Sequence, residues 1–226
     1  MYLVVFDCDG TLVDSQHTII HGLEVGFEAV GLPMPDRHTA LSIVGLSLEP
    51  AFLHLVGEEN AHLVPTMCDA YRTSKIARRE GGFDHDPLYP GTREVLDALS
   101  AREDVLLGVA TGKHSRGVAH MVEVHDLHGK FITVQTADKA PSKPHPGMLM
   151  QAMSETGAQP ERTVMIGDTS FDMEMARNAR VHAIGVSWGY HVPRELERAG
   201  ARRVIDAFPQ LLPALDEVLG WKKEIA

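Results

Sequence analysis

Short apolar runs alternate with longer amphipathic segments from about residue 88 to the end of the chain. The runs are too short for buried helices and predict strands, whereas the segments between them repeat apolar residues at helical spacing. This alternation favours an α/β fold with a Rossmann-like parallel sheet that helices cover on both faces. With a further run at residues 2–6, the expected strands are residues 105–110, 131–134, 163–166, 183–186 and 203–205; the expected helices lie near residues 91–100, 114–125, 146–157, 170–179, 193–199 and 207–219.

An all-helical segment interrupts this alternation directly after the first strand. A helix is expected from Ser15, a favourable N-cap, to Gly31, a favourable C-cap. Three further helical stretches are expected near residues 36–43, 48–56 and 59–79, and Pro65 should end or kink the last of them.

The change of pattern predicts two domains. Residues 1–14 and 88–226 would form the α/β core, and residues 15–87 would form a helical domain inserted into it. The return to the core between Asp84 and Gly91 is rich in Gly, Pro and Asp, which is typical of a linker.

The first apolar run ends at two aspartates, Asp7 and Asp9, and a glycine follows at once. This point is the carboxyl end of a predicted buried strand, where open α/β sheets bind ligands. Two carboxylates so close together repel each other unless a metal ion or a proton joins them. A calcium EF-hand is excluded because Thr11 and Thr18 occupy positions that need acids. Aspartates that only cap a turn, and the metal-binding Asp-x-Asp of a sugar-nucleotide transferase, remain open for this pair alone.

The composition restricts the partners. The chain has 226 residues and a net charge of -10, from 31 acidic and 21 basic residues, and no long basic stretch. A nucleic-acid or anionic-membrane partner needs a basic surface and is therefore not expected. Two cysteines cannot form a disulfide framework, and no stretch is long and apolar enough for a leader or a membrane span, so a cytoplasmic protein is expected. The protein is expected to be a monomer or a homodimer.

Polar residues follow three more of the predicted strands. Thr111 and Gly112 follow the second strand, Lys143 comes after the third, and Asp168 and Asp172 come after the fourth. In a parallel sheet all these strand ends point the same way, so the side chains can converge with Asp7 and Asp9 on one crevice. Carboxylates suit Mg²⁺, and a hydroxyl, a lysine and turn amides suit the oxygens of a phosphate. Lys113, between these segments, is expected to be solvated.

Four segments in this order resemble the four motifs of the haloacid dehalogenase superfamily. Asp7-Cys-Asp9-Gly-Thr-Leu-Val-Asp14 is similar to the first motif and Thr111 to the second. Lys143 is similar to the third motif and Gly167-Asp168-Thr-Ser-Phe-Asp172 to the fourth. The helical insertion after the first motif resembles the cap domain of the subgroup that contains phosphoglycolate phosphatase and β-phosphoglucomutase.

The resemblance implies a role for each motif residue. Asp7 would attack phosphorus to form an aspartyl-phosphate, and Asp9 would first protonate the leaving oxygen and then activate water. Mg²⁺ would bind the carboxylates of Asp7 and Asp168 and the backbone carbonyl of Asp9. Asp172 would bind the metal directly or act through water or hydrogen bonds. The remaining roles, in binding the phosphoryl group and neutralising its charge, fall to Thr111, Gly112 and Lys143.

Two cap residues are candidates to contact the substrate. Gly45 lies in a segment, residues 43–49, that resembles the specificity loop of related enzymes, although it could equally form a simple turn between helices. Arg72 could hold a substrate carboxylate with its two-pronged guanidinium, or could be a solvated helix position. Arg180 and His191 depart from the pattern of the family and are expected to lie away from the catalytic set.

The expected activity is Mg²⁺-dependent hydrolysis of a small phosphomonoester similar to phosphoglycolate. The expected partner is a small phosphorylated molecule. A β-phosphoglucomutase-like phosphomutase would share every motif residue, and a catalytically silent phosphate-binding protein could share the fold. A dehalogenase is less favoured because Asp9 suits protonation of an alkoxide, which a halide leaving group does not need.

Overall fold

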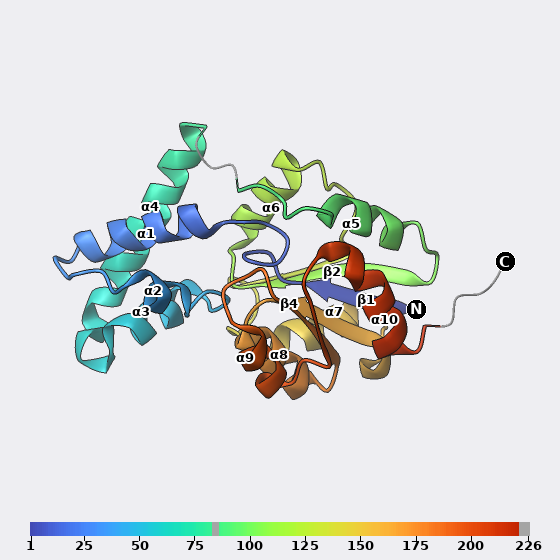
Figure 1. The fold of residues 1–226 in the computed structure, drawn as a ribbon. Helices are drawn as coiled ribbons and strands as arrows, with labels where there is room; N and C mark the ends of the chain where they lie inside the picture. Colours follow the sequence, from blue (N-terminus) through green and yellow to red (C-terminus); the bar gives the residue numbers. More distant parts are fainter. Residues whose placement is uncertain (83–85, 222–226) are drawn as a thin grey trace.

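The computed structural model describes residues 1–82 and 86–221, and six parallel strands form the sheet at its centre (Figure 1). The strand order is β3-β2-β1-β4-β5-β6. The predicted α/β fold with a Rossmann-like parallel sheet is therefore confirmed. The strands are β1 (Tyr2–Phe6), β2 (Val105–Thr111), β3 (Thr133–Thr136), β4 (Thr163–Gly167), β5 (His182–Val186) and β6 (Arg203–Ile205).

Helices cover both faces of this sheet, and alternate residues of each strand point to opposite faces. In β1, Val4 and Phe6 pack into one hydrophobic cluster and Leu3 and Val5 into another, and all four are fully buried. The first cluster includes side chains of α5 (Thr92–Ser100), α6 (Ser115–Val124) and α10 (Leu211–Leu219); the second includes side chains of α7 (Gly147–Thr156), α8 (Ser170–Ala179) and α9 (Pro193–Ala199).

The third strand differs from the prediction by two residues, because it begins at Thr133 instead of residue 131. Ile132 is 66% exposed, whereas Thr133 and Gln135 are buried and donate hydrogen bonds to Glu155 of α7. Buried polar side chains that share a hydrogen-bond partner thus occupy the strand, and an exposed apolar residue lies just before it. Hydrophobic pattern alone places the strand too early for this reason.

Among the described residues of the inserted segment, helices are the only regular secondary structure, and loops join them. Figure 1 shows them gathered beyond the carboxyl ends of the strands, with the N-terminus of the chain at the far end of the sheet. Pro65 lies in the first turn of the last helix, where proline is tolerated, so the predicted stretch divides just before it. The elements are α1 (Gln16–Glu28), α2 (Arg37–Leu41), α3 (Leu48–Val56), a 3₁₀ helix (Glu58–Leu63) and α4 (Val64–Glu80).

These helices have a hydrophobic cluster of their own, in which Phe27 of α1, Phe52 of α3 and Met67 of α4 are buried. We refer to residues 15–87 as the cap. The division into this cap and a core of residues 1–14 and 88–226 stays a prediction.

The two chain segments that join cap and core lie side by side. The Asp14 backbone N–H donates to the Pro87 carbonyl at 2.8 Å, and the Tyr89 N–H donates to the Leu12 carbonyl at 3.0 Å. Of the predicted linker, residues 84 and 85 lie outside the described residues. Among the residues that the structure describes, no helix has the length and apolarity to cross a membrane.

Candidate active site

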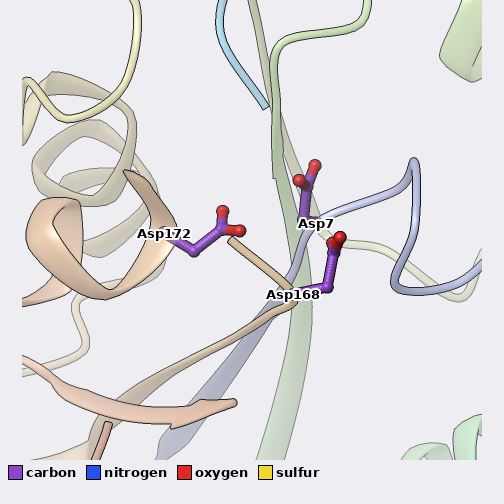
Figure 2. A group of neighbouring side chains, drawn as sticks. All are labelled: Asp7, Asp168 and Asp172. Carbon is purple, nitrogen blue, oxygen red and sulfur yellow. The ribbon is translucent and has the colours of Figure 1, made fainter. Parts of the chain in front are cut away.

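Three buried carboxylates meet at the carboxyl ends of β1 and β4. Asp7 follows β1, Asp168 follows β4, and Asp172 lies in the first turn of α8. One oxygen of each lies within 4.8 Å of the others, and all three residues are at most 1% exposed. Figure 2 shows Asp172 extending from its helix toward the strand ends that carry Asp7 and Asp168.

Lys143 is the cation of this cluster. Its ammonium lies 2.6 Å from Asp172 Oδ1 and 2.8 Å from Asp7 Oδ2, with no exposed side-chain surface. Burial alone would lower the pKa of Lys143, but the charges of Asp172 and Asp7 hold it above its ordinary value. Lys143 therefore stays protonated and links Asp7, which follows β1, to Asp172 of α8.

Asp172 is fixed by the start of its own helix. Its Oδ2 accepts hydrogen bonds from the Thr169 N–H at 3.0 Å and the Thr169 hydroxyl at 2.7 Å. The Asp172 N–H donates in return to the Thr169 hydroxyl oxygen at 3.4 Å, which completes a capping box. Gly167 leaves the room for this, since a Cβ there would lie 2.3 Å from Asp172 Cγ. With Oδ1 on Lys143 and Oδ2 on Thr169, Asp172 is placed to orient the cluster, and whether it binds the metal directly or indirectly stays a prediction.

Asp168 is held by groups from two other loops. The Thr11 hydroxyl donates to Asp168 Oδ1 at 2.7 Å, and the Tyr190 backbone N–H donates to Oδ2 at 2.9 Å. Thr11 and Tyr190 are supporting residues that sequence reasoning missed. Their loops follow the carboxyl ends of β1 and β5, the neighbours of β4, so the strand order would have indicated them.

The cluster carries an excess of negative charge. Burial raises the pKa of Asp7 to about 6, because lost solvation and repulsion by Asp172 outweigh the attraction of Lys143. Burial, with repulsion by Asp172 and Asp7, also raises the pKa of Asp168 well above its ordinary value. Three ionised carboxylates and one ammonium would leave a net charge of -2, which a divalent cation would neutralise. An all-oxygen donor set with this charge fits Mg²⁺.

Asp9 lies beside this cluster and is paired with Lys113, at 2.8 Å between Nζ and Oδ1. Burial would raise the pKa of Asp9, but the Lys113 ammonium and a hydrogen bond from Ser15 lower it. The expectation that Lys113 is solvated is wrong, because its side chain is only 15% exposed. Strands β1 and β2 are neighbours in the sheet, and their ends bring the two residues together.

Thr111 and Gly112 end the second strand next to this pair. Thr111 is the last residue of β2 and is 1% exposed, and Gly112 lies directly against the cap. A Cβ at Gly112 would lie 2.4 Å from the Leu46 carbonyl oxygen. The cap therefore covers the end of the site where a phosphate would bind.

The cap contributes both of its candidate residues to the same cavity as Asp7 and Asp9. Gly45 has a φ of +102°, which favours glycine, and a Cβ there would lie 2.9 Å from the Thr169 hydroxyl. Arg72 of α4 is paired at 3.4 Å with Glu49 and at 3.3 Å with Asp69, and its side chain is half exposed. Their roles in substrate binding stay predictions.

His191 does not lie away from the site, contrary to expectation. Its Nδ1 accepts from the Ser170 N–H at 3.1 Å, so its Nε2–H donates to the Ser42 carbonyl of the cap at 3.0 Å. The His191 N–H also donates to the Asp168 carbonyl at 3.3 Å. One side chain thus joins the start of α8 to the cap. Arg180, the other departure, is the left-handed C-cap of α8.

A family model provides the deciding comparison. Residues 4–186 match the haloacid dehalogenase-like hydrolases, a span that includes all the motif residues and the whole cap. The chain belongs to the haloacid dehalogenase-like hydrolase family. The predicted family and enzyme class, a hydrolase of the phosphatase kind, are therefore confirmed.

Individual relatives agree with this assignment over nearly their full length. The chain is 33% identical to the "Probable phosphatase IndB" of Dickeya dadantii, over 96% of this chain and 94% of that protein. It is 30% identical to a phosphoglycolate phosphatase of Salmonella choleraesuis, over 94% of this chain and 91% of that protein. The crystal structure of a hydrolase from Pseudomonas syringae superposes with a TM-score of 0.79 at 26% identity, and covers 96% of this chain and 99% of its own.

Proposed function

We propose that this family member is a Mg²⁺-dependent phosphatase that hydrolyses a small phosphorylated metabolite through an aspartyl-phosphate on Asp7. The observation that carries the proposal is the buried cluster of Asp7, Asp168 and Asp172 around Lys143, with Asp9 beside it. Relatives named phosphatases support the reaction class. Mg²⁺, held by Asp7, Asp168 and the Asp9 carbonyl, would supply positive charge to the phosphoryl oxygens.

The first half of the reaction would use the two aspartates of the first motif. A carboxylate oxygen of Asp7 attacks phosphorus, and Asp9 gives a proton to the oxygen that leaves. Lys143 offsets the charge that Asp7 and the phosphoryl group share, which lowers the cost of bringing two anions together. Thr111 and the Gly112 N–H bind the remaining phosphoryl oxygens.

The second half would release phosphate from Asp7. Asp9, now ionised, takes a proton from a water molecule, which attacks phosphorus and restores the Asp7 carboxylate. The Lys113 ammonium, 2.8 Å from Asp9, favours the ionised form that this step needs and disfavours the protonated form that the first step needs. The cap would exclude other water, and a second substrate hydroxyl in place of water would give a phosphomutase instead.

Turnover of a generic aryl phosphate tests this proposal. We expect release of inorganic phosphate at millimolar Mg²⁺ and its loss on chelation with EDTA. Absence of turnover would favour the silent phosphate-binding alternative. Conversion of a hexose 1-phosphate into its 6-phosphate without release of phosphate would favour the phosphomutase.

The metal-free protein should lose stability as the pH rises. The pKa of Asp7 is raised from 3.8 to about 6 on folding, so the folded state binds the proton more tightly. The contribution of this proton to stability is most favourable below the unfolded pKa and is lost as the pH rises through about 6, with a difference of about 2 kcal/mol between pH 4.5 and pH 7.5. Urea unfolding in EDTA at pH 4.5 and pH 7.5 measures this, with Asp7→Asn as the variant that lacks the titrating group.

Mg²⁺ should reverse that loss. We expect it to raise the melting temperature clearly at pH 7.5 and little at pH 4.5, because only ionised carboxylates bind it. An equal shift at both pH values, or the same pH dependence in Asp7→Asn as in the wild type, would contradict this account of the cluster.

A further inference from the structure

A cavity of about 600 Å³ extends from Asp7 and Asp9 into the space between the cap and α6. At the ~30 Å³ that one water occupies in the liquid, this is room for on the order of 20 water molecules. Phosphoglycolate has about nine non-hydrogen atoms, so it would leave roughly half of that space to water. The cavity is therefore larger than a two-carbon leaving group requires.

Apolar side chains of both the cap and the core line this cavity. The cap contributes Leu23 of α1, Val44 before α3, and Ile76 of α4, and the core contributes Met121 and Val124 of α6. Charged and polar side chains line the cavity as well, among them Lys75 and Arg79 of α4 and His120 of α6. Water between apolar walls is unfavourable, whereas an apolar ligand there would gain from burial.

Two of these wall residues are exposed although they are large and apolar. Ile76 is 50% exposed and Val124 is 37% exposed, and they line the cavity from the cap and from the core. Large exposed apolar side chains are few among the described residues, and the others, which include Ile132, do not line this cavity. A ligand that contacts both would bury them.

We propose that the leaving group of the substrate is an alcohol that carries an aromatic or heteroaromatic ring. The inference rests on the proposed phosphatase function and names its substrate class. Because the cavity is continuous with Asp9, the alcohol oxygen lies at the catalytic end while the ring lies between α4 and α6. The rim carries charges of both signs, among them Arg72, Glu49 and Arg116, which suit polar substituents on the ring.

Steady-state kinetics with three phosphomonoesters test this assignment. Phosphoglycolate serves as the small substrate, and pyridoxal 5′-phosphate and uridine 5′-monophosphate serve as ring-bearing ones. At saturating Mg²⁺, kcat/KM for at least one ring-bearing ester should exceed that for phosphoglycolate tenfold or more, because burial of a ring adds binding that glycolate lacks.

A matched pair of variants tests the place of the ring. Ile76→Ser removes apolar surface from the cavity wall, and should lower the ratio of kcat/KM for the preferred ring-bearing ester to that for phosphoglycolate threefold or more. Ile132→Ser makes the same change at a residue that is 66% exposed outside the cavity, and should leave this ratio within twofold. Both side chains are exposed, so neither variant should unfold the protein.

The outcomes separate this inference from the proposed function. Preference for phosphoglycolate, with activity that Asp7→Asn abolishes, would overturn the ring assignment and leave the phosphatase intact. The ring assignment would also be overturned if Ile76→Ser did not change the ratio of kcat/KM for the preferred ring-bearing ester to that for phosphoglycolate. If none of the three esters is hydrolysed, the proposed function fails, and the inference fails with it.

Discussion

Asp7→Asn is expected to lower kcat for phosphate-ester hydrolysis by about 10⁴-fold or more. An asparagine keeps the size of the side chain but cannot attack phosphorus or form an acyl phosphate. Residual binding of the phosphate by Thr111, Gly112 and Lys143 would not replace the nucleophile. The measurement is phosphate release from an aryl phosphate at saturating Mg²⁺, with wild type and variant purified in parallel.

A second aspartate provides the control for Asp7→Asn. Asp216 lies on α10, outside the cavity, so Asp216→Asn should keep kcat within about twofold. Retention of a tenth or more of wild-type kcat by Asp7→Asn, purified in parallel with this control, would exclude Asp7 as the nucleophile.

Lys143→Met should affect both folding and turnover strongly. It would leave the carboxylates of Asp7 and Asp172 buried without the ammonium that lies within 2.8 Å of each. Removal of one partner from a buried ion pair costs roughly 3–5 kcal/mol. We expect urea unfolding of the metal-free variant to show a loss of this order, and kcat to fall by about 10³-fold or more.

An exposed lysine four residues earlier in the chain is the matched control. Lys139→Met removes the same charge from the surface and should change the free energy of unfolding by less than about 0.5 kcal/mol. Mg²⁺ should recover part of the stability of Lys143→Met but little of its activity, because the metal can neutralise carboxylates without reaching the position of the ammonium. Full activity in Lys143→Met would contradict the role given to this residue.

The strand ends explain why much of the site could be predicted from the sequence. Asp7, Lys143 and Asp168 each follow an apolar run, and parallel strands bring such positions to one edge. The structure brings these residues together with Asp172, as expected. Asp7 and Asp168 come directly after β1 and β4, so the alternation of strands and helices is enough to predict where they lie. Lys143 comes seven residues after Thr136, the end of β3, so its position depends on the loop as well.

Contacts between separate loops could not be predicted in the same way. The sequence predicts a solvated Lys113 because a pattern along the chain does not show that β2 lies beside β1, which Asp9 follows in the loop. His191 was placed away from the site because its partner, the Ser42 carbonyl, belongs to the cap. The packing of the cap helices against the core decides this contact, and local sequence carries no record of it.

Trapping the covalent intermediate is the most direct test of the central claim, that Asp7 is the nucleophile. Acid quenching during turnover with Mg²⁺, followed by borohydride reduction, converts an acyl phosphate of aspartate into homoserine. Peptide mass spectrometry should then find homoserine at position 7 in the wild type and none at Asp9, Asp168 or Asp172. Rapid turnover with no modified residue, or homoserine at another aspartate, would contradict the account.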